Sequence, residues 1–372
     1  MRILIAGGGI AGLAASLALA ARGREVSVFE QAPSFEEVGA GLQIGPNGAR
    51  ALKALGAWEA VAPFGYAPPA ILIRDGQSGR ILSRLPLDGL DYRVFHRADL
   101  LRGLLATASA QPGIRLETGR RVLGFAGRKL ILDTGEESFD ALIGADGIRS
   151  AIRQQLLGDG PAPFAGQVIY RALIPRAGVG DAGPEINLWL CPGGHVVHYP
   201  VSGGRNLNIV AAVNGAWTHP GWSEPADAGE VLACFSGMAA PLARLLGLPL
   251  AYSKWAGASR PAASHWGEGP VTLIGDAAHP MLPYLAQGAV MAIEDAATLG
   301  ACLKSQEVET ALRHYERLRQ PRTARVAAAS GRLARIYHAQ GLERRARNLA
   351  IRLTPAFLAR AQLRKLWDWR PS

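Results

Sequence analysis

The chain has 372 residues, of which 49% are hydrophobic and 19% charged, and this composition is typical of a folded α/β protein and excludes a disordered one. Three cysteines, Cys191, Cys234 and Cys302, form no CxxC pair, and eight histidines show no metal-ligand spacing; a disulfide framework, a zinc site and a dithiol redox centre are therefore not expected, and a reducing cytoplasm is. The net charge of +10 comes almost entirely from arginine.

An apolar stretch opens the chain, from Ile3 to Ala21, and resembles a signal peptide or a membrane span. We interpret it as a buried strand over residues 2–6, a turn at Gly7-Gly8-Gly9 and a helix from Ile10 to about Arg22. This strand–turn–helix accounts for every early glycine, whereas a signal peptide accounts for none. No other stretch is long and apolar enough to cross a bilayer.

The turn carries the pattern GxGxxG on Gly7, Gly9 and Gly12, and a second strand follows over 25–30. In such a unit the first glycine allows the tight turn, the second lets a pyrophosphate approach the backbone, and the third lets helix and strand pack closely. The helix N-terminus stabilises the phosphate charge, and Glu30 is placed to accept hydrogen bonds from a ribose diol. These residues predict a dinucleotide site and leave FAD and NAD both open.

The residue pattern in the middle of the chain predicts mostly strands. A strand pair is expected within 71–85, and a further strand, Ala141–Gly144, runs into a turn at Ala145-Asp146-Gly147 and then a helix. From about 161 to 265, short alternating runs separated by glycine and proline predict antiparallel strands.

One of these runs, His195-Val196-Val197-His198-Tyr199, carries side chains suited to catalysis. Because strand side chains alternate between faces, His195 and Tyr199 share one face and His198 lies on the other. Histidine suits a general base since its pKa lies near working pH. The alternative is that His195 caps the turn after Gly193-Gly194 and Tyr199 is ordinary core, and a register shift by one residue would turn His198 inward.

A strand that ends at Gly275-Asp276 is followed by a loop with Pro280 and Pro283, and Gly288 opens a helix that we expect to be amphipathic. From about 305 the chain is expected to be helical, with breaks near Pro321 and Pro355. Much of the arginine lies here. It predicts either a surface for nucleic acid or anionic membrane, or a solvated helix face with a subunit contact; we favour the solvated face because no nucleic-acid motif accompanies the charge.

Two segments, GADGIRS at 144–150 and GDAAHPMLPYLAQG at 275–288, together with the N-terminal GxGxxG, resemble the single-component FAD-dependent aromatic hydroxylases. That family includes p-hydroxybenzoate hydroxylase and, more similar to this chain, salicylate hydroxylase and 3-hydroxybenzoate 6-hydroxylase. The resemblance covers residues 1 to about 330. It implies FAD as the ligand and an α/β fold in which a Rossmann-type FAD-binding domain carries an inserted antiparallel β-sheet substrate domain, followed by C-terminal helices.

The resemblance also implies roles in the FAD site. Asp276 would bond the ribityl chain, the helix opening at Gly288-Ala289 would point at the N1–C2=O edge of the flavin, and Asp146 would lie at the pyrophosphate and the NAD(P)H docking site. Arg97, in a segment similar to the family's HRxxL element, would reach the cofactor. His279 is expected to shape its loop rather than act as a base. The predicted cofactor-binding residues are completed by Ile10, Ala11, Gln31 and Val122.

For the substrate site, the resemblance to the family rests on the spacing between candidate residues. Related hydroxylases place a histidine and a tyrosine four residues apart on one strand over the substrate, and His195 and Tyr199 match, with His195 as the base for a phenol. Pro283 matches the proline whose carbonyl faces the phenol in p-hydroxybenzoate hydroxylase, although Leu282 is proline in that enzyme. His198 and Pro283 are the predicted substrate-binding residues.

The implied activity is hydroxylation of a small phenolic or N-heteroaromatic acid through a flavin C4a-hydroperoxide, with NADH or NADPH as a transient co-substrate alongside O2. We expect neither nucleic-acid binding nor stable membrane insertion. We expect a cytoplasmic monomer or homodimer. The alternatives are epoxidation, hydroxylation of a heterocycle such as urate, or dehydrogenation on the same fold, and, in another class, an FAD-binding interaction module with a basic tail. The expected domains are FAD-binding (1–70, 97–160, 265–330), substrate (71–96, 161–264) and C-terminal helical (331–372).

Overall fold

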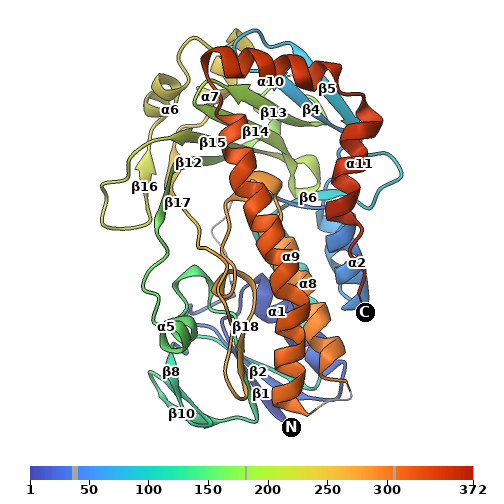
Figure 1. The fold of residues 1–372 in the computed structure, drawn as a ribbon, viewed down its shortest axis with the longest axis vertical. Helices are drawn as coiled ribbons and strands as arrows, with labels where there is room; N and C mark the ends of the chain where they lie inside the picture. Colours follow the sequence, from blue (N-terminus) through green and yellow to red (C-terminus); the bar gives the residue numbers. More distant parts are fainter. Residues whose placement is uncertain (36–40, 181, 305–306, 372) are drawn as a thin grey trace.

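The computed structural model describes residues 1–35, 41–180, 182–304 and 307–371. Two sheets occupy opposite ends of the molecule along its long axis, and C-terminal helices run along one side and link them (Figure 1). The architecture is the α/β arrangement expected from the sequence, with a parallel sheet at one end and a largely antiparallel sheet at the other.

The first sheet is parallel and has the order β18-β11-β1-β2-β7. Its central strands are buried along nearly their whole length, as expected of a sheet covered on both faces. The strands are β1 (Arg2–Ala6), β2 (Glu25–Phe29), β7 (Ile114–Glu117), β11 (Ala141–Gly144) and β18 (Val271–Leu273).

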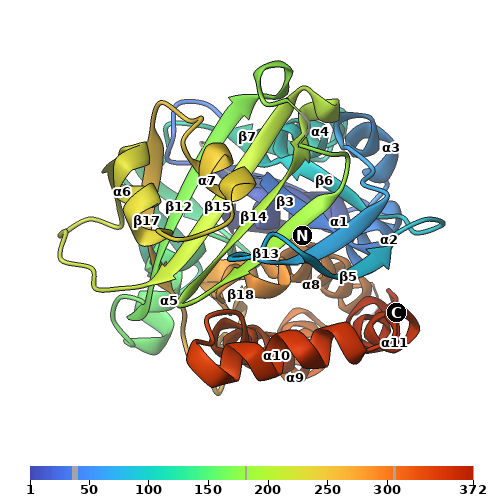
Figure 2. The same cartoon turned by 90° about the horizontal axis from the view of Figure 1, so that it is seen from above.

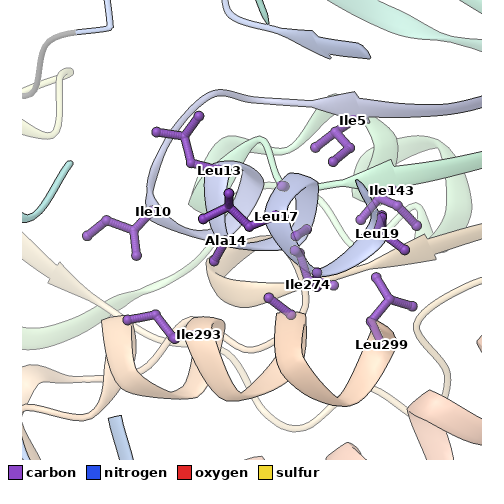
Figure 3. Packing of buried hydrophobic residues seen from close by; sticks show 14 of the residues in the cluster. Ile5, Ile10, Leu13, Ala14, Leu17, Leu19, Ile143, Ile274, Ile293 and Leu299 are labelled. Atoms are coloured by element: carbon purple, nitrogen blue, oxygen red, sulfur yellow. The ribbon is translucent and has the colours of Figure 1, made fainter. Parts of the chain in front are cut away.

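Helix α1 (Ile10–Ala20) packs between this sheet and α8 (Gly288–Cys302). Figure 3 shows Leu13 and Leu17 of α1 among sheet residues such as Ile5 and Ile143, with Ile293 of α8 facing the helix. Helix α8 is not amphipathic, contrary to expectation, because α1, α2 (Pro46–Ala54) and α9 (Val308–Tyr337) surround it and bury most of its length.

The second sheet has eight strands in the order β16-β17-β12-β15-β14-β13-β4-β5, all antiparallel except the pair β13/β4. Figure 2 shows α6 (Ala228–Cys234) and α7 (Ala240–Leu246) over its outer face, where only strands were expected. The strands are β4 (Ala70–Asp75), β5 (Ile81–Pro86), β12 (Phe164–Pro175), β13 (Ile186–Cys191), β14 (Gly194–Val201), β15 (Asn206–Asn214), β16 (Ser223–Ala226) and β17 (Tyr252–Ala258).

Smaller elements complete the fold. Strands β3 (Gly41–Ile44) and β6 (Arg93–His96) form a two-stranded sheet, and β8 (Val122–Ala126), β9 (Lys129–Leu132) and β10 (Gly135–Ser138) form a three-stranded one. The remaining helices of this part of the chain are α3 (Trp58–Val61), α4 (Arg97–Ser109) and α5 (Ala151–Leu157).

The C-terminal helices differ from expectation at one of two prolines. Pro321 lies inside the continuous helix α9, whereas Pro355 does separate α10 (Gly341–Leu353) from α11 (Ala356–Trp367). Ion pairs from Arg319 and Arg322 to α8, on either side of Pro321, hold α9 in place and offset the cost of about 3 kcal/mol of an internal proline.

The basic C-terminal segment is only partly the solvated face that the sequence suggested. Arg317, Arg325 and Arg332 are exposed, but Arg319 and Arg347 are buried in contacts with other elements. None of the described helices is long and apolar enough to cross a membrane.

Candidate active site

The glycine turn after β1 leaves the N-terminus of α1 open to a ligand. Gly7 has φ +100°, and a Cβ there would lie 2.5 Å from the carbonyl oxygen of Ala145, whereas a Cβ on Gly12 would lie 1.9 Å from the carbonyl oxygen of Gly7. Gly9 caps α1 without a side chain, and no acidic residue stands in the first turn. The first N–H groups of α1 are therefore available to an anion such as a pyrophosphate.

Glu30 closes one side of this turn. Its Oε2 accepts the N–H of Gly8 at 2.8 Å, and its Oε1 accepts the N–H of Ala32 at 2.9 Å. Each carboxylate oxygen keeps further acceptor capacity, which fits a ribose diol. The other predicted cofactor residues lie at the same end: Ile10 is buried in α1, Ala11 is half-buried beside it, and Gln31 is exposed after β2.

Asp146 faces the same turn from β11. Its Oδ2 accepts the N–H groups of Ala151 and Ile152, but its Oδ1 is buried and has no hydrogen-bond partner among the residues that the structure describes. Burial raises the pKa of this carboxyl. A buried acceptor without a partner fits a site that a hydroxyl or N–H of a ligand completes.

The segment GDAAHPMLPYLAQG at 275–288 adds a second open helix end to the proposed FAD cradle, by which we mean the Gly7–Gly12 turn with Glu30 and Asp146 and the Gly275–Gly288 segment. Gly275 has φ +60°, and a Cβ there would lie 2.9 Å from the Cβ of Ala11, so this turn packs against the start of α1. Asp276 is exposed, with its Oδ1 4.0 Å from the position of a Cβ on Gly288. The first turn of α8 has neither a side-chain cap nor an acidic residue. Two open helix N-termini and these carboxylates fit FAD.

His279 lies in the loop between these features and contacts the protein rather than an open site. Its Nε2 donates to Oδ2 of Asp295 at 2.5 Å, and the same oxygen accepts the N–H of Gly275 at 3.0 Å. Burial works to raise the pKa of Asp295, but His279 and Arg319 outweigh it and hold the pKa at about 2. This geometry matches a loop-shaping role.

The inner face of the second sheet turns toward this cradle. His195 packs its ring 5.0 Å from that of Tyr284, which lies in the loop after β18, and a Cβ on Gly41 of β3 would lie 2.7 Å from the ring of Tyr199. Val197 stands between His195 and Tyr199 and is only half-buried. The structure thus brings His195 and Tyr199 to one face, opposite the elements that carry the FAD cradle.

The predicted residue His198 lies on the outer face of the same strand. Its ring stacks on Trp189 at 6.3 Å, within the core that α6 and α7 cover. Burial, and then the charge of Arg74, lower the pKa of His198 to about 3. The alternation of β14 separates it from His195 and Tyr199, so we correct its assignment to substrate binding.

His195 is a buried, neutral imidazole. Burial, and then its neighbour His338, lower the pKa of His195 to about 3. Tyr199 is also buried, and burial raises the pKa of its hydroxyl. At neutral pH His195 is therefore an uncharged imidazole with one lone pair that can accept a hydrogen bond, and Tyr199 remains a hydrogen-bond donor.

Sequence reasoning missed Arg171 on this face. Arg171 of β12 lies opposite Val210, which in turn lies opposite Val197, so the three share one face of the sheet. The guanidinium lies 5.7 Å from the ring of Trp255, and its Nε is buried without a partner among the described residues. Burial, and then the nearby Arg97, lower its pKa. Only the register across three strands could have revealed it.

The other predicted residues lie at the edges of this space. Arg97 begins α4 and is half-buried. Pro283 is exposed next to Tyr284, and its neighbour Leu282 accepts the hydroxyl of Ser330 through its carbonyl at 2.6 Å. Val122 is half-buried at the start of β8.

Comparison with known proteins agrees with this geometry. A family model described as an FAD binding domain matches residues 1–330. The chain is 38% identical over 362 residues to 3-hydroxybenzoate 6-hydroxylase of Polaromonas naphthalenivorans, covering 93% of this chain and 90% of that one. It is 37% identical to 3-amino-4-hydroxybenzoate 2-monooxygenase of Streptomyces cremeus, covering 91% and 88%.

Solved structures show the same architecture. A variant of HpxO from Klebsiella pneumoniae, complexed with FAD, superposes with a TM-score of 0.88 at 25% identity, covering 99% of this chain and 98% of that one. A salicylate hydroxylase substrate complex superposes with a TM-score of 0.85 at 26% identity, covering 99% and 95%. The chain belongs to the FAD-dependent aromatic hydroxylase family and is an FAD-binding monooxygenase.

Proposed function

We propose that this monooxygenase hydroxylates a small phenolic acid, with NADH or NADPH as electron donor and O2 as oxidant. The observation that carries the proposal is the inner face of β12, β15 and β14, which presents a neutral imidazole, His195, and the guanidinium of Arg171, whose Nε is buried, around the half-buried Val197. His195 is suited to accept the proton of a phenolic hydroxyl, and Arg171 is suited to bind a carboxylate. The similarity to hydroxybenzoate and aminohydroxybenzoate hydroxylases supports this substrate class.

Each side chain then has a defined task. Arg171 binds the carboxylate of the substrate, and His195 takes the phenolic proton, which raises the electron density of the ring. Tyr199 donates a hydrogen bond from the β3 side, and Pro283 borders the pocket beside Tyr284. When bound, FAD supplies the electrons from NAD(P)H and activates O2 for transfer to the ring. The two sheets exclude water from the space between them.

The predicted cofactor residues hold FAD in this scheme. Gly7, Gly9 and Gly12 admit the pyrophosphate at the start of α1, and Glu30 binds the ribose. Asp146 and Asp276 bind polar groups of the cofactor, and the first N–H groups of α8, at Gly288 and Ala289, face the flavin ring. Arg97 reaches the cofactor from the start of α4, and the set is completed by Ile10, Ala11, Gln31 and Val122.

A second candidate substrate is an anionic N-heterocycle. HpxO from Klebsiella pneumoniae has been solved with FAD and uric acid, and that structure superposes on this chain with a TM-score of 0.86 at 25% identity. Arg171 suits an anionic heterocycle as well as a carboxylate, because a guanidinium binds either through paired N–H groups. We further propose a cytoplasmic monomer or homodimer, consistent with the free thiols of the described cysteines.

The proposal is tested by NADH and NADPH oxidation by the FAD-loaded enzyme with hydroxybenzoates, hydroxynicotinates, anthranilate and urate, and by measuring hydroxylated product and hydrogen peroxide together. We expect a hydroxybenzoate to stimulate oxidation and to yield product in step with it. Stimulation by urate alone would favour the heterocycle. A fully FAD-loaded enzyme that no compound stimulates would overturn the phenolic-acid proposal.

A further inference from the structure

Three side chains from distant parts of the chain form one hydrogen-bonded series behind the proposed base. Nδ1 of His195 lies 3.0 Å from Nε2 of His338, and Nδ1 of His338 lies 2.7 Å from Oδ1 of Asn214. His195 is on β14, Asn214 ends β15, and His338 follows the last turn of α9. Both imidazoles are buried, whereas Asn214 is exposed.

The order of donors and acceptors fixes where the protons are. The amide oxygen of Asn214 can only accept, so Nδ1 of His338 carries a hydrogen. In a neutral imidazole the other nitrogen then accepts, so Nε2 of His338 takes the hydrogen from Nδ1 of His195. The hydroxyl of Tyr284 lies farther from the same Nε2, at 3.3 Å, and the shorter contact from His195 therefore has the better claim to its single lone pair. The remaining nitrogen of His195, Nε2, is left with its lone pair.

We propose that Asn214 and His338 are positioning residues that hold His195 in the tautomer whose basic atom is Nε2, and that His338 receives the proton next. This inference rests on the proposed function, in which His195 is the base. The tautomer itself is a property of the protein without substrate, so it can be tested separately.

The proton transfer balances at each step. The phenolic O–H bond breaks as Nε2–H forms on His195, and the phenolate remains on the substrate. The Nδ1–H of His195 then passes to Nε2 of His338, which leaves His195 neutral and the positive charge on His338. His338 and Asn214 line a surface groove of about 590 Å³ together with Gln340, Glu343 and Arg335, from which water can take the proton.

The electrostatic surroundings keep both imidazoles neutral until a substrate ionises. Burial, and then Arg347, lower the pKa of His338 to about 4, so neither imidazole is charged at neutral pH. The groups that face the pair are the hydroxyl of Tyr284, the ring of Tyr337 beside His195, and Arg347, Arg335 and Glu343 around His338. A phenolate beside His195 would raise the pKa of the pair, because a nearby negative charge favours the protonated imidazole.

Nitrogen-15 NMR of the histidine-labelled, FAD-loaded enzyme reads the tautomer directly, with His195→Gln to assign the signal. We expect His195 to show a protonated Nδ1 and an unprotonated Nε2. Asn214→Leu should remove the acceptor for Nδ1 of His338 and so populate the other tautomer of His195. Asn214→Asp keeps an acceptor and should preserve the native tautomer. A native His195 that carries its hydrogen on Nε2 would overturn the inference, whether or not the enzyme hydroxylates a phenol.

Proton release gives the kinetic readout. A phenolic acid that the enzyme hydroxylates is mixed anaerobically with the oxidised enzyme in weak buffer with a pH indicator. We expect His338→Gln to slow proton release by on the order of 10²-fold at nearly unchanged substrate affinity. Asn214→Asp should release protons at close to the native rate. Native release rates in a fully FAD-loaded His338→Gln enzyme would rule out the transfer to His338.

Discussion

Arg171 is the residue whose substitution most directly separates substrate classes. Its guanidinium stands on the inner sheet face with a buried Nε that no described residue satisfies. A hydrogen bond to a charged group contributes about 1.5–3 kcal/mol, so we expect Arg171→Leu to raise the KM for a hydroxybenzoate by roughly 10- to 100-fold with a smaller effect on kcat. Initial-rate kinetics of the FAD-loaded enzyme measure this.

Two controls sharpen that prediction. Arg171→Lys keeps the charge but loses the paired donors, so its KM should fall between those of the native and Leu enzymes. A phenol without a carboxylate should bind equally weakly to the native enzyme and to Arg171→Leu. An equal rise in KM for the carboxylate and for the plain phenol would show that Arg171 shapes the pocket rather than binding the anion.

At this scale the sequence predicts local patterns and misses long-range partners. Gly7, Gly9, Gly12 and Glu30 could be found because their spacing within one strand–turn–helix already implies their geometry. The facing of His195 and Tyr199 followed from strand alternation. His338 could not be found, because 143 residues separate it from His195 and only the fold brings the two rings together.

Helices α8 and α9 are joined by a buried ionic network that also anchors the Gly275 loop. Glu294 and Asp295 of α8 are fully buried, and Arg319 bonds both, at 2.8 and 2.6 Å. Removing one partner of a buried ion pair leaves an uncompensated charge, which costs about 3–5 kcal/mol. We expect Arg319→Ala to lower the free energy of unfolding by that amount, measured by urea denaturation with saturating FAD.

The matched control is Arg317→Ala, which removes an exposed arginine from the same helix. Its effect should stay within about 0.5 kcal/mol, as is usual for surface substitutions. Similar losses in both variants would mean that general helix charge, and not the network with Glu294 and Asp295, stabilises α9.

The same network explains which elements the sequence misjudged. A proline interrupts a helix only if nothing else holds the two halves, and Arg319 and Arg322 hold them around Pro321. Helix α8 was expected to be amphipathic, but even its two carboxylates, Glu294 and Asp295, are fully buried. Strands β1, β11 and β18 could be predicted because each lies in a mostly apolar run, whereas the edge strand β7, with the sequence IRLE and only partial burial, was not predicted.

Across the whole molecule, three histidines are buried as neutral rings within the second sheet and its contact with α9. The pKa values of His195 and His198 lie at about 3 and that of His338 at about 4, against about 6.5 in an unfolded chain. Below pH 6.5 these three histidines bind protons in the unfolded chain but stay unprotonated in the native protein. Stability is therefore complete above pH 6.5 and declines as the pH falls toward these native pKa values.

We expect acid to destabilise the enzyme well before its carboxylates titrate. At pH 5 each of the three histidines should cost about 2 kcal/mol relative to pH 7.5, from the shift between unfolded and native pKa values. His198→Asn offers a clean test, because His198 lies on the outer sheet face, away from the proposed site. Urea denaturation with saturating FAD at pH 7.5 and pH 5 should show about one third less pH-dependent loss in this variant. An unchanged loss would mean that His198 can protonate in the native protein, and that the outer core admits charge more readily than its burial implies.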